Sequence, residues 1–383
     1  MRLLHTADWH LGRSLNGASF HADQEALLAG PFLDLVRDAR PDALLIAGDV
    51  FDRAVPPADS VALLDEVLRR IVLDLRVPVV LIPGNHDEAR RLAFGAPLLR
   101  GAGLHIADSA RGEAIRFRDA HGEVVVLASG YASPLLLATL FAPEEVADHD
   151  AGFGCICRHL RGLCDPGVRS VVVAHAFVAG GAECDSERAL AVGGAKAVSP
   201  ARFEGFHYVA LGHLHRPQSL AGGRIRYSGS PLAYSFSEAG QAKSVTLVEL
   251  DATGAVRTEE IPLTPPRALR RIRGLFDDLL RDGPPAGGRG DWVEVTLTDP
   301  RPVFEAQRRL AEVYPHILGF GYARHEALDA AEGAPAPALR PENAEPLALL
   351  GEFWREMRGE ALPEAAEPVA RAAIDLARAA EEA

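Results

Sequence analysis

The sequence contains few cysteines and no long apolar run. Its cysteines do not form a C-x-x-C pair, so neither a disulfide framework nor a cysteine-rich zinc site is expected. The four are Cys155, Cys157, Cys164 and Cys184. No stretch approaches about 18 consecutive apolar residues, and the first apolar segment begins at Leu3 without a basic, apolar signal region before it. We therefore expect a soluble, cytoplasmic protein with no membrane partner.

Positive charge is also scarce. The chain carries 53 acidic and 40 basic side chains, and its net charge of −13 is not typical of a nucleic-acid binder. The acid is unevenly spread, because residues 331–383 contain 11 Asp and Glu against 5 Arg. Lys196 and Lys243 are the only lysines, so arginine supplies 38 of the 40 basic residues. Arginine favours bidentate phosphate contacts, but genomic base composition explains the bias equally well, and composition leaves the substrate open.

Five short polar motifs occur in order along the chain. Each follows an apolar, β-branched run of the kind that forms a strand buried on both faces. The motifs are Asp8-Trp9-His10, Gly48-Asp49, Gly84-Asn85-His86-Asp87, Ala174-His175 and Gly212-His213-Leu214-His215. Because the ligand crevice of layered α/β folds lies at the carboxyl ends of the strands, we expect these side chains to meet in one site.

These residue types are those of a two-metal hydrolytic site. Residues two apart in an extended segment point to the same side, so Asp8 with His10, and His213 with His215, are expected to converge. Asp49 is the candidate bridge, since a carboxylate shared by two cations holds them about 3.5–4 Å apart. Mixed imidazole, carboxylate and amide ligands suit manganese, iron or zinc, and we expect two divalent ions, with Mn²⁺ favoured. The seven predicted ligands are Asp8, His10, Asp49, Asn85, His175, His213 and His215.

His86 and Asp52 are the candidate catalytic residues. Two cations activate a bridging water for in-line attack at phosphorus, and the leaving oxygen then needs a general acid. His86 is the predicted acid, and Asp52 is predicted to accept a hydrogen bond from it and keep it protonated. Asp87 is expected to shape the turn rather than touch metal. A solitary buried histidine such as His175 is usually a core residue, so the prediction depends on the motifs taken together.

The chain divides into segments of different composition. Residues 1–264 carry all five motifs and are predicted to be an α/β domain with two mixed β-sheets packed face to face and helices outside. A Pro-rich segment, 262–266, marks the boundary to a small α+β capping domain at 267–330. In the first domain, further strands are predicted at 113–117, 123–127, 224–227 and 244–248. In the capping domain, the predicted elements are a helix over 269–276, a strand over 292–297 and a helix over 302–313.

Four arginines are candidate substrate contacts. Arg53 follows the second motif, and Arg267, Arg270 and Arg271 cluster at the start of the capping domain. For the cluster, a solvated helix face is the simpler interpretation and a contact with a phosphate backbone is the alternative.

Beyond the capping domain, residues 331–345 are rich in Ala, Pro and Glu and are predicted to be a linker. Residues 346–383 are predicted to form a helical tail that binds a partner, although the helices could instead fold back on the body. Its apolar face comprises Leu350, Phe353, Trp354, Met357, Val369 and Leu376. A second apolar stripe, in the helix predicted over 59–75, either covers the sheet or provides a homodimer contact.

The ordered motifs resemble those of the calcineurin-like metallophosphoesterase superfamily. The residues around the motifs narrow the resemblance to the family of SbcD-type nuclease subunits of bacterial SbcC–SbcD complexes. The resemblance spans essentially the whole chain. The segments that carry it are Leu4–Gly12, Gly48–Asp52, Leu211–Gln218 and Tyr227–Pro231. The implied fold is the metallophosphoesterase sandwich with a capping domain and a helical tail.

This resemblance implies a manganese-dependent DNA nuclease that acts in DNA repair and recombination. It implies an exonuclease on duplex ends and an endonuclease on single strands and hairpins, with His86 as the catalytic histidine. The implied ligands of one cation are Asp8, His10, Asp49 and His215, and those of the other are Asp49, Asn85, His175 and His213. The implied partners are DNA, a second copy of the chain and an SMC-like ATPase of the SbcC type, whose coiled coil the tail helices would bind. A nucleoid-associated location follows from these partners, and the capping domain would help to position the DNA.

Other activities on the same core are the main alternatives. A phosphoprotein phosphatase, a cyclic-nucleotide hydrolase or a nucleotide-sugar hydrolase would share the metal site. The segment Gly48–Arg53 is similar to the phosphatase pattern, in which the arginine grips the substrate phosphate. The capping domain and the tail argue against a small-molecule hydrolase. A non-catalytic scaffold should have lost ligands, and this sequence retains all of them.

Overall fold

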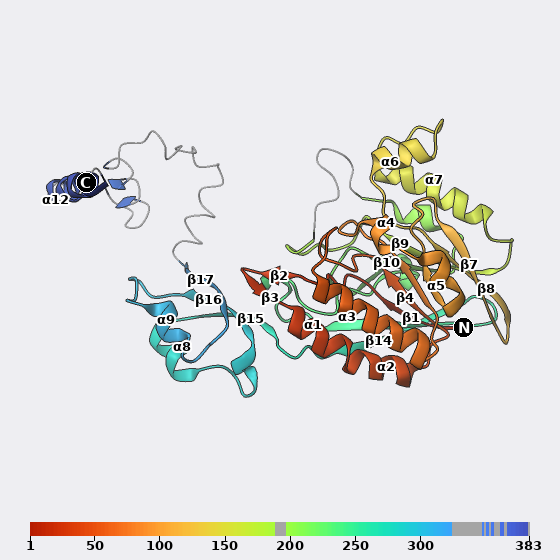
Figure 1. The fold of residues 1–383 in the computed structure, drawn as a ribbon, viewed down its shortest axis with the longest axis horizontal. Helices are drawn as coiled ribbons and strands as arrows, with labels where there is room; N and C mark the ends of the chain where they lie inside the picture. Colours follow the sequence, from red (N-terminus) through yellow and green to blue (C-terminus); the bar gives the residue numbers. More distant parts are fainter. Residues whose placement is uncertain are drawn as a thin grey trace. The chain divides into compact units, whose positions relative to one another are not determined.

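The computed structural model describes residues 1–187, 197–323, 347, 350–351, 354–355, 361–363 and 366–381 (Figure 1). The chain falls into two compact units, Met1–Tyr322 and Ala323–Ala383. Within the described residues, no helix has both the length and the apolar character needed to cross a membrane.

Two six-stranded sheets form the body of the first unit. Their strand orders are β14-β13-β1-β4-β5-β6 and β11-β12-β10-β9-β8-β7. The first sheet consists of β1 (Arg2–Thr6), β4 (Ala43–Ala47), β5 (Val79–Ile82), β6 (Leu104–Ile106), β13 (Lys243–Leu250) and β14 (Val256–Leu263). The second consists of β7 (Glu113–Asp119), β8 (Gly122–Ala128), β9 (Arg169–His175), β10 (Tyr208–Gly212), β11 (Gln218–Leu220) and β12 (Ile225–Tyr227). The strands predicted from the sequence in this region are therefore confirmed.

The two sheets pack face to face through side chains that alternate along each strand. In β4, Leu45 points between the sheets and packs with Val80, Val126 and Val173. Its neighbour Leu44 points the other way, into the layer of helices. Both sheets are mixed. In the first, β1, β4, β5 and β6 run parallel, and β13 is antiparallel to its two neighbours, β1 and β14. In the second, the edge strands β7 and β11 are antiparallel to their neighbours. The predicted fold class is confirmed.

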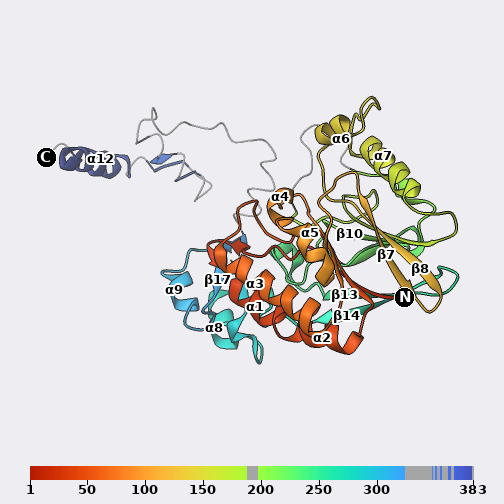
Figure 2. The ribbon, with the colours of Figure 1, turned by 45° about the vertical axis from the view of Figure 1, so that its right-hand side comes forward.

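Helices cover the outer face of each sheet (Figures 1 and 2). Helices α1 (His21–Leu28), α2 (Pro31–Ala39) and α3 (Ala58–Arg69), which continues as the π-helix η1 (Arg70–Asp74), pack their apolar faces on the first sheet. Helices α6 (Pro134–Leu140) and α7 (His149–Gly162) cover the second sheet. The helix predicted over 59–75 is thus present, and its buried side includes Leu64, Val67 and Ile71. The four cysteines are free.

Several short elements complete the unit. They are β2 (Ser14–Leu15), β3 (Ala18–Ser19), α4 (Ala89–Leu92), α5 (Ala96–Leu99), η2 (Arg100–Ala102), η3 (Pro200–Phe203), η4 (Ala221–Gly223), η5 (Phe236–Glu238) and η6 (Gly288–Gly290).

A third sheet of three parallel strands follows the Pro-rich boundary segment 262–266. Its order is β15 (Leu269–Gly274), β16 (Trp292–Leu297) and β17 (Ile317–Tyr322), with α8 (Phe276–Asp282) and α9 (Ala306–Leu310) as connections. The strand predicted over 292–297 is confirmed, but the helix predicted over 269–276 is wrong. Leu269 and Ile272 have helical spacing, yet this segment pairs with the whole of β16, and the helix begins only at Phe276. Pairing with a neighbouring strand overrides local spacing here.

This third sheet is joined to α1 through one buried carboxylate. Asp23 accepts hydrogen bonds from Arg267 Nε at 2.8 Å and from Trp292 Nε1 at 2.9 Å. The Arg267 guanidinium lies 4.5 Å from the centre of the Trp292 ring, and the Phe20 ring lies 5.8 Å from the same ring. The contact combines charge, stacking and apolar burial.

The second unit contains α12 (Glu367–Glu381), and Leu350 and Trp354 lie in helical turns before it. Val369 is 71% exposed. The predicted linker 331–345, Phe353 and Met357 lie outside the described residues, as does the side chain of Leu376.

Candidate metal centre

The predicted site lies where the carboxyl ends of five strands meet. Strands β1, β4 and β5 run parallel in the first sheet, and β9 and β10 run parallel in the second, so the motif after each strand lies at the same edge. Backbone contacts join the motifs across the two sheets. Asp8 N donates to Gly48 O at 3.0 Å, and His213 N donates to the Asp8 carboxylate at 2.9 Å. These protein contacts alone hold the predicted ligand side chains close together.

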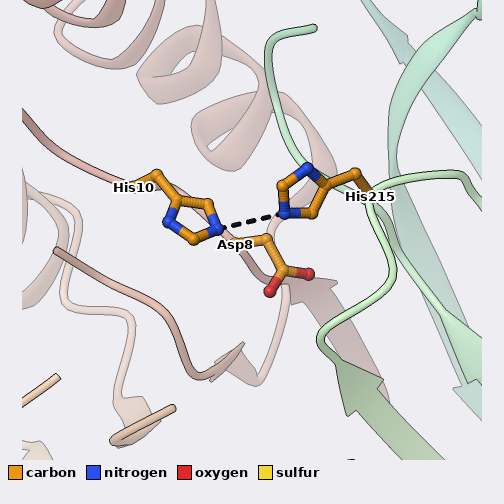
Figure 3. A group of neighbouring side chains, drawn as sticks. All are labelled: Asp8, His10 and His215. Carbon is orange, nitrogen blue, oxygen red and sulfur yellow. Dashed lines mark hydrogen bonds between the residues drawn. The ribbon is translucent and has the colours of Figure 1, made fainter. Parts of the chain in front are cut away.

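One carboxylate oxygen lies between two groups of imidazoles. Asp49 Oδ2 is 3.6 Å from His10 Nε2 and 3.4 Å from His175 Nε2. On the first side, His10 Nε2 faces His215 Nε2 at 3.0 Å, with Asp8 beside them (Figure 3). These contacts gather the predicted ligands of the first cation.

Asn85 gathers the other side of the centre. Its Oδ1 lies 2.9 Å from His175 Nε2 and 3.3 Å from His213 Nδ1. The structure therefore brings all seven predicted ligands to one place, with Asp49 between the two groups. Three overlapping sets have ligand atoms within 4.8 Å of one another: Asp8, His10 and His215; His10, Asp49 and His86; and Asp8, Asp49 and His175.

The backbone reaches this geometry by an unexpected route. Asp8, His10, Asp49 and His213 have φ values of 55°, 44°, 48° and 107°, in the left-handed region that side chains rarely adopt. The prediction that Asp8 converges with His10, and His213 with His215, in extended segments is therefore wrong in its reason, although the side chains do converge. Each such residue costs about 1–3 kcal/mol and persists only where its surroundings hold it. Such conformations are typical of functional sites.

Two glycines are required by the closeness of these turns. A Cβ on Gly84 would collide with the backbone and carboxylate of Asp49, and a Cβ on Gly48 would meet His175 Nδ1. The glycines of the sequence motifs are therefore explained by close approach.

The electrostatics of the centre follow from burial. Burial raises the pKa of Asp8 well above its ordinary value. Burial also raises the pKa of Asp49, but His175 and the other imidazoles outweigh it and leave that pKa well below its ordinary value. Burial lowers the pKa of both His10 and His213 well below the ordinary value, which leaves them neutral. His10, His213 and Asp49 are therefore held in the neutral or ionised states in which such groups bind cations, whereas burial opposes the ionisation of Asp8.

His175 differs from His10 and His213 in its pKa. Burial lowers its pKa, but Asp49 and Asp8 raise it, and the balance is a pKa of about 9. A protonated imidazole beside buried carboxylates supplies the positive charge that a bound cation would supply.

The donor set fits divalent ions of the manganese, iron or zinc type. His10 Nε2 and His215 Nε2 face each other at 3.0 Å, although both rings have lowered pKa values and each neutral ring has a lone pair on one nitrogen. Imidazole nitrogen, carboxylate oxygen and amide oxygen together form the mixed set that these metals prefer. One neutral ring can donate its Nε2–H to the lone pair of the other, and a cation bound there would take the place of that hydrogen.

His86 lies beside this centre, but its partner is not the predicted one. Its Nδ1 lies 2.9 Å from the backbone carbonyl of Asp52, and its ring centre is 4.7 Å from that of His10. The Asp52 carboxylate instead accepts a hydrogen bond from Arg13 Nη1 at 2.7 Å. The predicted hydrogen bond between His86 and the Asp52 carboxylate is therefore wrong. The physical reason is that the Arg13 guanidinium, a charged donor, takes the carboxylate and leaves the backbone carbonyl to meet His86.

Asp87 shapes the turn, as expected. Its carboxylate accepts hydrogen bonds from the backbone N–H groups of Val50, Phe51 and Gly84 at 2.9–3.0 Å. Burial raises the pKa of Asp87 to about 6.

Several polar residues around His215 were not found from the sequence. Ser186 Oγ lies 2.7 Å from His215 Nδ1, and Glu187 Oε1 accepts a hydrogen bond from the His215 backbone at 2.7 Å. Glu238 and Lys243 form a fully buried ion pair behind Ser186. Burial raises the pKa of Glu238, but His215 and Lys243 outweigh it and hold that pKa well below its ordinary value. The available signal was Lys243, one of only two lysines in an arginine-rich chain.

The four candidate substrate arginines have different surroundings. Arg53 is 65% exposed and its Nε lies 3.7 Å from an Asp52 carboxylate oxygen. Arg267 is engaged with Asp23, as described above. Arg270 and Arg271 are paired with Asp291 and Glu294.

Comparison with known proteins agrees with this geometry. The family model described as calcineurin-like phosphoesterase matches residues 1–217, more than half of the chain. The model described as the type 5 capsule protein repressor C-terminal domain, which is the SbcD C-terminal domain, matches residues 265–358.

Two solved structures are also similar to this chain. The 5'-nucleotidase precursor from Thermus thermophilus is 17% identical, with a TM-score of 0.36 and coverage of 69% of this chain and 54% of that chain, so this chain spans about half of its length. The calcineurin-like phosphoesterase YfkN from Bacillus subtilis is 13% identical, with a TM-score of 0.37 and coverage of 69% and 90%. From the two family matches together, the chain belongs to the calcineurin-like phosphoesterase family and is an SbcD-type metallophosphoesterase.

Proposed function

We propose that this chain is a manganese-dependent DNA nuclease, acting as an exonuclease on duplex ends and as an endonuclease on single strands and hairpins. The observation that carries the proposal is the position of Asp49. A single oxygen, Oδ2, lies 3.6 Å from His10 Nε2 on one side and 3.4 Å from His175 Nε2 on the other. This position between the two groups of side chains supports a carboxylate shared by two cations.

The residues divide into two ligand sets around that oxygen. One cation would be held by Asp8, His10, Asp49 and His215, and the other by Asp49, Asn85, His175 and His213. When bound, the pair of cations lowers the pKa of a shared water and neutralises charge on the phosphate.

His86 would protonate the leaving oxygen. Its Nδ1 is occupied by the Asp52 carbonyl, so Nε2 is the nitrogen that remains to carry a proton to substrate. Asp52 contributes through this carbonyl, while its carboxylate holds Arg13. Arg53 is the best placed of the four candidate arginines to meet a substrate phosphate, because it is the most exposed and its carboxylate contact, at 3.7 Å, is the loosest, whereas the other three each hold a carboxylate at hydrogen-bonding distance.

We also propose the partners that an SbcD-type chain implies. The tail, with Leu350, Phe353, Trp354, Met357, Val369 and Leu376, would bind an SMC-like ATPase of the SbcC type. The match of the SbcD C-terminal domain to residues 265–358 supports this partnership. DNA repair and recombination at the nucleoid is the matching cellular role, and residues 267–330 would act as the domain that helps to position DNA.

A homodimer is supported by an apolar surface beside α3. A groove of about 450 Å³ is lined by Val61, Leu64, Leu68 and Leu73, among others. Phe94, at its rim, is 87% exposed. Exposed apolar patches of this kind are typical of protein interfaces, and a second copy of the chain is the proposed occupant.

The proposed function is tested by comparing the hydrolysis of four substrates. The purified chain is incubated with duplex ends, hairpins, a phosphoprotein and a cyclic nucleotide, each with Mn²⁺ and with chelator. The proposal predicts Mn²⁺-dependent release of nucleotides from DNA, and little hydrolysis of the other two. Faster hydrolysis of the phosphoprotein or the cyclic nucleotide would refute the nuclease assignment. Nuclease activity that persisted both without metal and in His86→Gln would refute the site assignment.

A further inference from the structure

Three of the imidazoles at the centre have their outward nitrogen held by a specific oxygen, and they differ in the kind of oxygen. His175 Nδ1 lies 3.0 Å from the Ala47 carbonyl, and His86 Nδ1 lies 2.9 Å from the Asp52 carbonyl. His215 Nδ1 lies 2.7 Å from a side chain, Ser186 Oγ. Backbone carbonyls cannot be removed by substitution, but a serine hydroxyl can.

The serine hydroxyl is itself fixed by a carboxylate. Ser186 Oγ lies 2.5 Å from Glu238 Oε1, and Lys243 Nζ lies 2.5 Å from Glu238 Oε2. Glu238 Oε1 also accepts the backbone N–H of Tyr234 at 3.1 Å. An ionised carboxylate carries no proton, so the Ser186 hydroxyl must donate its only hydrogen to Glu238.

The proton on His215 then has one place. Since the Ser186 hydrogen points to Glu238, the short contact between Ser186 Oγ and His215 Nδ1 requires the ring to donate through Nδ1–H. A neutral imidazole protonated on Nδ1 has its lone pair on Nε2. That nitrogen is the one that faces His10 and the centre of the site.

We propose that Ser186, backed by Glu238 and Lys243, is a positioning residue that fixes the tautomer and the ring orientation of His215 and so presents Nε2 to a cation. The proposal deepens the function given above and depends on His215 being a metal ligand. Metal-bound histidines generally donate their second ring nitrogen to an oxygen, and loss of such partners typically lowers metal affinity about 10–100-fold.

The network comes from three separate parts of the chain. Ser186 lies in the loop after β9, Glu238 is at the end of η5, and Lys243 begins β13. Lys243 Nζ also donates to the His215 backbone carbonyl at 3.0 Å. The same network therefore holds both the ring and the backbone of His215, which fixes the orientation of its side chain.

The test compares three variants of the full chain: Ser186→Thr, Ser186→Val and Ser186→Ala. Threonine and valine have nearly the same shape, and only threonine keeps the hydroxyl. Mn²⁺ binding is measured by calorimetric titration, and the metal-free unfolding temperature is measured by circular dichroism. Electron paramagnetic resonance then distinguishes a magnetically coupled Mn²⁺ pair from isolated ions.

We expect Ser186→Thr to bind two Mn²⁺ like the unchanged chain. Ser186→Val should bind one ion about 10–100-fold more weakly, and the coupled signal should give way to that of isolated Mn²⁺ at limiting metal. Ser186→Ala should behave like Ser186→Val, and it takes the place of that variant if valine prevents folding.

Two results would overturn the proposal, and they are distinguishable. Equal Mn²⁺ affinity and equal coupling in the threonine, valine and alanine variants would show that Ser186 only anchors its loop, while the metal site stands. Absence of any Mn²⁺ binding in the unchanged chain would remove the metal site itself, and the proposed function with it.

Discussion

The edge where the two large sheets meet and the three-stranded sheet of residues 269–322 arrange their polar groups in opposite ways. At the edge, His10 Nε2 shares a hydrogen bond with His215 Nε2 at 3.0 Å, while the buried His10 Nδ1 has no hydrogen-bond partner among the residues that the structure describes. In the three-stranded sheet, exposed Arg271 pairs with Glu294 on the next strand. Buried polar groups normally have complementary partners, and leaving one without costs about 1–3 kcal/mol. The comparison teaches that clustered buried carboxylates and imidazoles indicate an external ligand, whereas exposed, oppositely charged pairs indicate structure.

The largest effect is expected from the shared carboxylate. Asp49→Asn should abolish the second cation and lower kcat for DNA cleavage on the order of 10³-fold, because metal ions supply several kcal/mol of stabilisation in the transition state. Steady-state nuclease rates at saturating Mn²⁺ provide the measurement. The control is Arg308→Ala, which removes an exposed ion pair with Glu305 in the other region and should leave the rate unchanged. A comparable loss of kcat in both variants would show that the two regions do not differ in their contribution to catalysis.

A smaller loss is expected from the imidazole beside the ligands. His86→Gln should lower kcat about 10²-fold, within the usual range for general acids, while two Mn²⁺ remain bound. Rates and metal content are measured on the same preparation. Loss of a bound ion in His86→Gln would show that His86 is a ligand rather than the acid.

Mn²⁺ should stabilise the folded chain only when the predicted metal ligands at the edge of the two large sheets are intact. A ligand present at about 100 times its Kd stabilises the folded state by about 2.7 kcal/mol per site, and chelator should remove this gain. Urea unfolding with Mn²⁺ and with chelator gives the difference. Arg271→Ala should keep the full gain and Asp49→Asn should lose most of it. An equal gain in both would place the bound metal elsewhere.

The junction between the two regions provides an intermediate case. Arg267→Ala removes one of two partners from the buried Asp23 carboxylate and should destabilise the chain by about 1–3 kcal/mol in urea unfolding. Arg271→Ala, whose ion pair is exposed, should have a smaller effect. If Arg267 instead contacts DNA, its removal would leave stability unchanged and would lower the salt dependence of DNA binding by about one phosphate contact.

The smallest expected effect is on the pH dependence of stability, and it comes from an ion pair at the end of β9 opposite to the metal centre. Arg169, at the start of β9, makes two hydrogen bonds to Asp119 and holds the pKa of that carboxyl well below its ordinary value. A lowered pKa in the folded state adds stability that is present above the ordinary value of about 3.9 and is lost as pH falls further. Unfolding free energy measured from pH 6 to pH 3 should fall less steeply in Asp119→Asn. An identical slope would contradict this assignment.

Much of the fold was accessible from the sequence because the two large sheets have strong local signals. Continuous apolar runs such as 43–47 and 170–173 fit strands buried on both faces, and the motifs after them mark the strand ends. The segment 269–274 was misjudged because its apolar residues have helical spacing, and only pairing with β16 decides its structure.

The sequence predicted which residues form the candidate site, but it did not predict how their backbone and side chains are arranged. The residue types identified the seven side chains that the structure brings together, yet the left-handed turns at Asp8 and Asp49 depend on contacts between distant strands. The same is true of Asp52, whose carbonyl rather than carboxylate meets His86. Ser186 and Glu238 were missed because they act through His215, and no short motif connects segments that lie about fifty residues apart.

Anomalous diffraction from crystals equilibrated with Mn²⁺ tests the central claim most directly. The account predicts two manganese peaks about 3.5–4 Å apart, with Asp49 touching both, Asp8, His10 and His215 on one, and Asn85, His175 and His213 on the other. A single peak, or manganese bound away from Asp49, would contradict the two-metal site on which the proposed nuclease depends.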